Sequence, residues 1–173
     1  VFCAWQWRLE HTDHNWNQTM TAPVPAWDLY LAKLILAAGV SFLAQAAIGV
    51  LFVISGKLAG IDAPIPPELP GWLFFGGLGG VAVCALQLYL SLVIRAFAIP
   101  VAIALAGGIA GLMLTSQGLG YAFPYSLLCL GMRANNPTMA LDLGPFLLGC
   151  GVYILLFFAL SVRHLTRRDV SAG

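Results

Sequence analysis

Charged side chains are scarce in this chain. Asp, Glu, Lys and Arg make up 9% of its 173 residues, against about 25% in a typical soluble domain, and the formal net charge is only +1. So small a charge provides no dense basic surface, which is what nucleic-acid binding requires. We therefore expect a protein that contacts the lipid bilayer and has no nucleic-acid partner.

The charges are rarest in four long apolar stretches. Each stretch has the roughly 20 residues that a helix needs to cross a hydrocarbon core of ~30 Å. Lys33 is the only charged residue within them, and it lies near one end, where its ammonium group can reach the interface. The pattern predicts an all-α integral membrane protein with a transmembrane domain over residues 29–162, crossing at residues 29–55, 72–94, 96–116 and 143–162.

The middle of each apolar stretch has no carboxylate, histidine or basic side chain. Ion-driven transporters and charge-selective channels usually depend on such groups within the membrane. The chain also has no G-x-x-x-x-G-K motif followed by Ser or Thr, so ATP hydrolysis would have to occur on another chain. If the protein transports a substrate, we expect the energy to come from a partner, and we expect no cofactor on this chain.

Metal and redox motifs are also missing. The four cysteines are too far apart to form a C-x-x-C pair. Glu10, His11, Asp13 and His14 could form a metal cluster, because His11 and His14 fall on one helical face, but the stretch lacks the H-E-x-x-H spacing of zinc enzymes. We interpret it as a solvated polar face and expect no metal. A membrane-embedded metal enzyme that uses Glu10–His14 is one alternative, and a non-catalytic assembly subunit is another.

Residues 1–28 differ from the rest of the chain because they are rich in tryptophan and polar side chains. They contain four of the five tryptophans, and on a helix Trp5, Leu9, Trp16 and Met20 fall near one face. Such a pattern is typical of an amphipathic helix lying in the membrane interface. We predict such a helix before the first span.

The distribution of basic residues predicts the orientation. With four spans, residues 1–28 and the basic tail at 163–173 lie on the same side, which holds most of the Lys and Arg residues, and the positive-inside rule makes that side cytoplasmic. The opposite side has only Lys57 and Arg133. Residues 118–142 then face outward. Their apolar run is too short to cross the membrane, so we expect a re-entrant or interfacial segment.

Small and polar residues within the spans suggest two further roles. Gly76 and Gly80, and likewise Gly107 and Gly111, have the G-x-x-x-G spacing that lets helices approach closely in lipid. This spacing fits either a contact between subunits or packing within one chain. Polar side chains in the spans either line a transport path or hydrogen-bond across helices; they are Gln45, Gln87 and Tyr89.

The string from Glu10 through Trp16 and the Pro23-Val24 pair to Lys33 resembles the cytoplasmic segment of ABC-2 type transporter permeases. It is most similar to the permeases of lantibiotic-immunity and related peptide-export systems. The resemblance implies that this segment couples the permease to a cytoplasmic ABC ATPase, which binds ATP and Mg²⁺. The residues implied to form that interface are Glu10, His11, Asp13, Trp16, Pro23, Val24 and Lys33.

The resemblance also implies the assembly. A family permease half has six membrane helices, so the four predicted spans would be the last four, and residues 1–7 would be the end of the second. Two halves, identical or different, would form an exporter in the bacterial plasma membrane. The cargo would be a lantibiotic, another peptide or an amphipathic drug-like molecule. The sequence leaves the choice of cargo and the direction of transport open.

Overall fold

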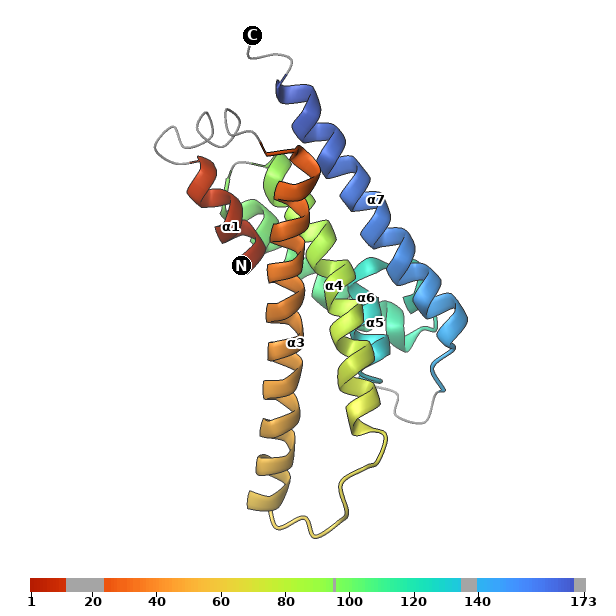
Figure 1. Ribbon diagram of the computed structural model, residues 1–173. Coiled ribbons are helices and arrows are strands. Elements are labelled where there is room, and N and C mark those ends of the chain that lie inside the picture. Colours follow the sequence, from red (N-terminus) through yellow and green to blue (C-terminus); the bar gives the residue numbers. More distant parts are fainter. Residues whose placement is uncertain (12–23, 95, 135–139, 170–173) are drawn as a thin grey trace.

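The computed structural model describes residues 1–11, 24–94, 96–134 and 140–169 (Figure 1). All regular structure in these ranges is helical, which confirms the predicted all-α fold. The elements, in chain order, are α1 (Phe2–His11), α3 (Ala26–Leu58), α4 (Leu69–Val93), α5 (Ala98–Ser116), the 3-10 turn η1 (Gly120–Ala122), α6 (Pro124–Gly131) and α7 (Leu143–Asp169). Among them α3, α4, α5 and α7 are long and apolar enough to cross a membrane, as predicted.

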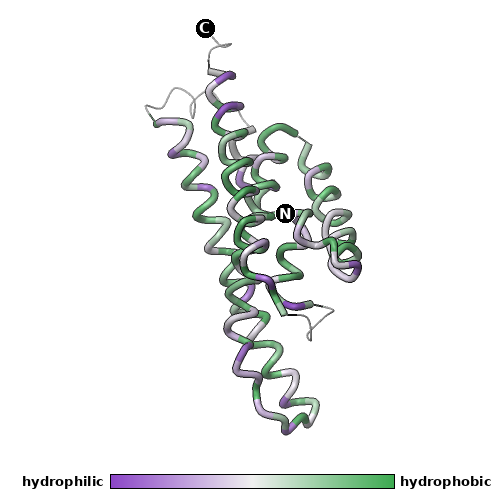
Figure 2. The backbone as a smooth tube through the Cα atoms, turned by 90° about the vertical axis from the view of Figure 1, so that its right-hand side faces the viewer, coloured by the Kyte–Doolittle hydropathy of each residue, from purple (hydrophilic) through white to green (hydrophobic). Residues whose placement is uncertain are grey.

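Three of these helices extend beyond the stretches that hydropathy marked, and α4 does so at its start, because it begins at Leu69, before residue 72. The 33-residue α3 starts before residue 29 and continues past residue 55 to Leu58. The last helix, α7, continues through the basic residues after 162 to Asp169. Figure 2 shows this end of α7 as hydrophilic, in contrast to its apolar middle. Arg163 and Arg167 favour the extension, because arginine is a good helix former and a cation is stabilising near a helix C-terminus.

Helix α4 is the centre of the molecule. It packs against α1, α3, α6 and α7, and Figure 1 shows it between α3 and α7. One apolar cluster joins α4 to α1, α3 and α7 around Tyr30 and Leu88. A second cluster joins α4 to α6 and α7 around Leu127 and Phe146. The core is therefore built around one helix and its neighbours.

Glycines allow the closest of these contacts. At Gly79 in α4 a Cβ atom would lie 2.5 Å from the carbonyl oxygen of Leu127 in α6, and at Gly131 it would collide with the backbone of Phe75 and Gly76. Only a residue without a side chain fits where two backbones come this close. These glycines bring the short helix α6 directly against α4.

Helix α6 lies within the segment that we predicted to be re-entrant or interfacial. Pro124 begins the helix, and seven of its eight residues are buried. The Ser126 hydroxyl donates a hydrogen bond to the Gly111 carbonyl of α5, 3.1 Å away. The segment thus packs tightly against α4 and α5, and its re-entrant placement in a bilayer stays a prediction.

Candidate functional site

Helix α1 packs against the membrane helices through one face. Cys3, Ala4, Gln6 and Trp7 are buried on that face, and Trp7 is 0% exposed, whereas Trp5 on the other side is half exposed. The buried face contacts α3 and α4. The residues before 12 are therefore part of the helical core and not a separate appendage.

Lys33 connects α1 to the first membrane helix. Its ammonium group donates a hydrogen bond to the backbone carbonyl of Gln6 at 3.1 Å and lies 4.7 Å from the centre of the Trp7 ring. A cation over an indole face is attracted by the ring, and the attraction is stronger where water is partly excluded. Lys33 is half-buried and lies two turns into α3. The contact therefore ties α1 to the beginning of α3.

Two thiols, one buried and one half-buried, make a second connection. The Cys3 thiol donates a long hydrogen bond to the Cys84 carbonyl of α4, 3.9 Å away, and the Cys84 thiol donates one to the Ala37 carbonyl of α3, also 3.9 Å away. Hydrogen bonding with the Cys84 side chain, together with burial, holds the pKa of Cys3 above its ordinary value. A thiol in this environment stays neutral and acts as a packing group.

The other residues of the predicted ATPase interface lie only partly within the described ranges. Glu10 and His11 are in the last turn of α1, and Val24 is exposed just before α3 begins. Asp13, Trp16 and Pro23 lie outside the described residues, and so does His14. Within the described ranges, no group of three His, Cys, Asp or Glu side chains is placed to hold a metal ion. The Glu10–His14 cluster lies largely beyond those ranges and is not tested.

The candidate path residues face three different helix interfaces. Gln45 of α3 is buried beside Gly76 of α4. The Gln87 amide of α4 donates a hydrogen bond to the Tyr125 hydroxyl of α6 at 2.5 Å. Tyr89 packs its ring on Phe157 of α7, with 5.8 Å between ring centres. Two roles were predicted for these polar side chains, lining a transport path and hydrogen-bonding across helices. Gln87 does hydrogen-bond across helices. A role in transport remains a prediction for all three residues.

The four glycines of the G-x-x-x-G pairs face neighbours within the chain. Gly76 lies against Met132 and Gln45, and Gly80 lies against Ser41, whose hydroxyl donates to the Gly77 carbonyl at 3.2 Å. In α5, Gly107 and Gly111 both face the segment around Tyr125. All four glycines thus pack within the chain, and a contact between subunits stays a prediction.

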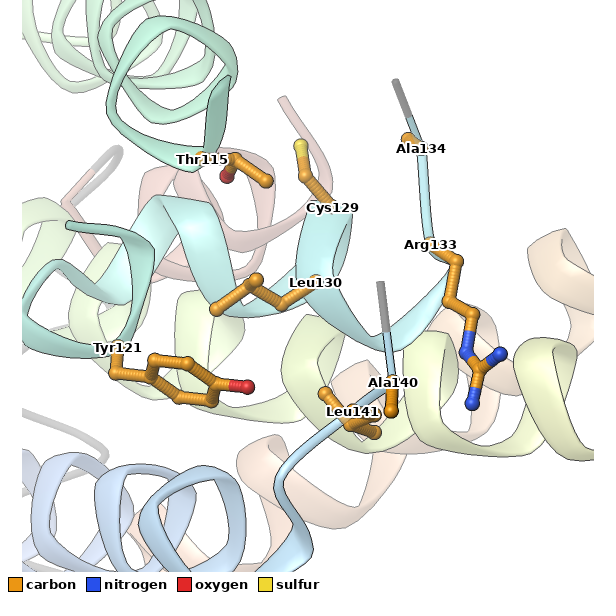
Figure 3. A pocket seen from close by; sticks show the side chains of 8 residues that line it. All are labelled: Thr115, Tyr121, Cys129, Leu130, Arg133, Ala134, Ala140 and Leu141. Atoms are coloured by element: carbon orange, nitrogen blue, oxygen red, sulfur yellow. The ribbon is translucent and has the colours of Figure 1, made fainter. Parts of the chain in front are cut away.

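A pair of cavities at the opposite end of the molecule was not expected from the sequence. One lies between α5, α6 and the start of α7, and Figure 3 shows Tyr121 and Leu130 lining it. The second lies between α4, the end of α6 and the start of α7, and Trp72 and Phe75 line it. Arg133 borders both. One feature of the sequence could have pointed to these cavities: Arg133 is one of only two basic residues predicted on the side opposite the cytoplasm.

Comparison with known proteins identifies the membrane domain. A family model described as ABC-2 family transporter protein matches residues 1–111. The match covers α1, α3 and α4 and most of α5, and so includes the contact of Lys33 with Gln6 and Trp7. No curated protein and no solved structure matches the chain.

Proposed function

The chain belongs to the ABC-2 family of transporter proteins, and from that premise we propose that it is one half of the permease of an ATP-driven exporter. It is a multi-pass membrane component of a transporter, not an enzyme. Permeases of this family generally pair with an ABC ATPase. The family match over residues 1–111 is the observation that carries the proposal.

The coupling role is proposed for α1 together with the segment up to Lys33. An ATPase bound near Glu10 and His11 would move as it closes on ATP. The Lys33 ammonium group holds the Gln6 carbonyl and the Trp7 ring, so a displacement of α1 would displace the start of α3 with it. Packed helices transmit such displacements as rigid bodies. The 33-residue α3 would then carry the motion across the bilayer.

The proposed cargo is a lantibiotic, another peptide or an amphipathic drug-like molecule, and the proposed role is self-immunity or resistance. The resemblance of the segment from Glu10 to Lys33 supports this choice. A path between two halves, which includes Gln45, Gln87 and Tyr89, would accept apolar groups, because the membrane helices have no carboxylate, histidine or basic side chain in their middle. Both ends of the described chain would face the cytoplasm of a bacterial cell, as the basic residues indicate.

The test is to purify the full-length protein from its own membrane in a mild detergent and to measure the ATPase that accompanies it. Glu10→Ala should loosen the complex and lower the amount of ATPase recovered. Lys33→Gln should leave the ATPase bound but lower the ATPase rate that cargo stimulates, because the link between α1 and α3 is weakened. Lys57→Gln is the matched control: it removes the same charge from the opposite end of α3 and should change neither quantity.

Other outcomes would point to other functions. A protein that purifies without any ATPase contradicts the proposal, and bound metal that is lost in His11→Ala or His14→Ala would then identify a metal enzyme. An ATPase that binds but has the same rate with and without this chain would identify an assembly subunit. Equal effects of Lys33→Gln and Lys57→Gln would contradict the coupling role of Lys33.

A further inference from the structure

Arg133 has a backbone conformation that its residue type rarely adopts. It follows α6 with φ = 51°, and no other described residue except glycine has a positive φ. Its N–H bonds to the Leu130 carbonyl at 3.0 Å, and the next N–H bonds to the Cys129 carbonyl at 2.9 Å. This is the position after a helix that glycine usually occupies, and a residue with a side chain is strained there. Such strain is typical of functional positions.

The guanidinium group of Arg133 has no acceptor in the described part of the chain. Its central carbon lies 5.8 Å from the centre of the Trp72 ring, and it forms no hydrogen bond or ion pair there. The side chain is only half exposed. A guanidinium group is always charged and has five N–H donors, and partly removing it from water without an acceptor is costly. An anion bound here would provide the acceptor that these donors require.

The cavity beside this group suggests the chemistry of that anion. Figure 3 shows the Arg133 side chain pointing away from Tyr121 and towards the ribbon of α4. There it borders a cavity of about 290 Å³ whose walls include Trp72, Phe75 and Leu143. Among the described residues that line this cavity, Glu68 is the only acidic one, and it is exposed. One cation above apolar and aromatic walls fits an amphiphile with an anionic headgroup.

We propose that Arg133 binds the phosphate of an anionic phospholipid from the surrounding bilayer, with the glycerol and the first acyl carbons against Trp72, Phe75 and Leu143. Arginine binds phosphate through two parallel N–H bonds. Trp72 is at the start of a membrane helix, where tryptophan is typical of the headgroup level. Basic pockets between membrane helices on the cytoplasmic side bind lipid headgroups, and the same pairing of a cation with a phosphate is open to Arg133 on the opposite side. The proposal requires only the membrane spans and is independent of the ATPase.

The test uses the full-length protein in nanodiscs of phosphatidylcholine with a minor share of phosphatidylglycerol, followed by native mass spectrometry of the retained lipid. The wild-type protein should retain phosphatidylglycerol in preference to phosphatidylcholine. Arg133→Gln should lower this retention about tenfold, the effect of losing a charged hydrogen bond. Arg133→Lys should fall between them, because it keeps the charge and loses the paired donors. Lys57→Gln, which removes a cation from the same side, should retain the lipid.

Arg133→Gly separates binding from folding. Glycine tolerates φ = 51°, so this variant should melt no lower than the wild type while it loses the lipid. Equal retention in all variants, or equal loss in Lys57→Gln, would overturn the proposal. So would equal retention of both lipids. If inorganic phosphate displaces the lipid and binds without it, the site is one for small anions and the lipid assignment is wrong.

Discussion

Helices α4 and α7 are alike by hydropathy and opposite in their packing. The most apolar 18-residue stretch has a mean hydropathy of 1.8 in α4 and 2.2 in α7. Half of the α4 stretch is buried within the molecule, whereas only 11% of the α7 stretch is. In α4 four closely spaced glycines lie against side chains or backbone of α3 and α6. The difference teaches that hydropathy marks a membrane helix, whereas small residues decide whether protein surrounds it.

The contact surface of α7 is a narrow stripe. Its fully buried residues are Phe146, Cys150, Ser161 and Leu165, at the spacing of one helical face. Six of its other large apolar side chains are exposed, with Leu148 at 70%, and six are half-buried. A helix with one buried stripe tolerates most substitutions, and a helix buried on several faces tolerates few. The predictions that follow test this contrast.

The largest effect is expected within α7 itself. Phe146 is 0% exposed, and its ring packs edge-on against Phe75 with 5.9 Å between centres. Phe146→Ala leaves a cavity and should destabilise the fold by about 3–5 kcal/mol. Leu148→Ala should change stability by less than about 0.5 kcal/mol. Thermal unfolding in detergent measures both, and similar losses would mean that the stripe is not the contact surface.

A smaller effect is expected when a glycine of each helix is replaced. Gly79→Ala places a methyl group 2.5 Å from the Leu127 carbonyl oxygen, where the backbone of α6 has to move. Overpacking of this kind costs about 1–3 kcal/mol. At Gly151 of α7 a Cβ atom meets nothing within 4 Å, so Gly151→Ala should be neutral or stabilising by up to about 1 kcal/mol. A destabilised Gly151→Ala protein would contradict the exposed position of that face.

The smallest effect is expected for two tyrosine hydroxyl groups. Tyr30 is buried and donates to the Ala85 carbonyl of α4 at 2.9 Å, whereas the half-buried Tyr153 of α7 donates to the Ala122 carbonyl at 2.6 Å. Tyr30→Phe should cost about 1 kcal/mol, because the hydroxyl is enclosed. Tyr153→Phe should cost less, since water can replace the lost partner. Chemical denaturation compares them, and the reverse order would mean that burial does not set the cost.

The membrane helices could be predicted from the sequence because each one depends on the length and hydropathy of its own stretch. It did not indicate which helix lies in the centre, since that depends on where α6 packs against Gly79 and Gly111. Lys33 was singled out by resemblance, but its position over Trp7 arises only when α1 folds back on α3. The Arg133 cavity was missed because it is formed by residues as far apart in the sequence as Pro67 and Leu143, and no local pattern joins them.

The length of α3 has a consequence for the choice of membrane. Lys33 and Lys57 are 24 positions apart on one continuous helix, which corresponds to about 36 Å along its axis. A hydrocarbon layer of ~30 Å fits between the backbone positions of the two lysines with about 3 Å to spare at each end. In a thinner bilayer α3 has to tilt, and the Lys33 contact would turn α1 with it. Lipid chain length should therefore act on this transporter through the same lysine that connects α1 to α3.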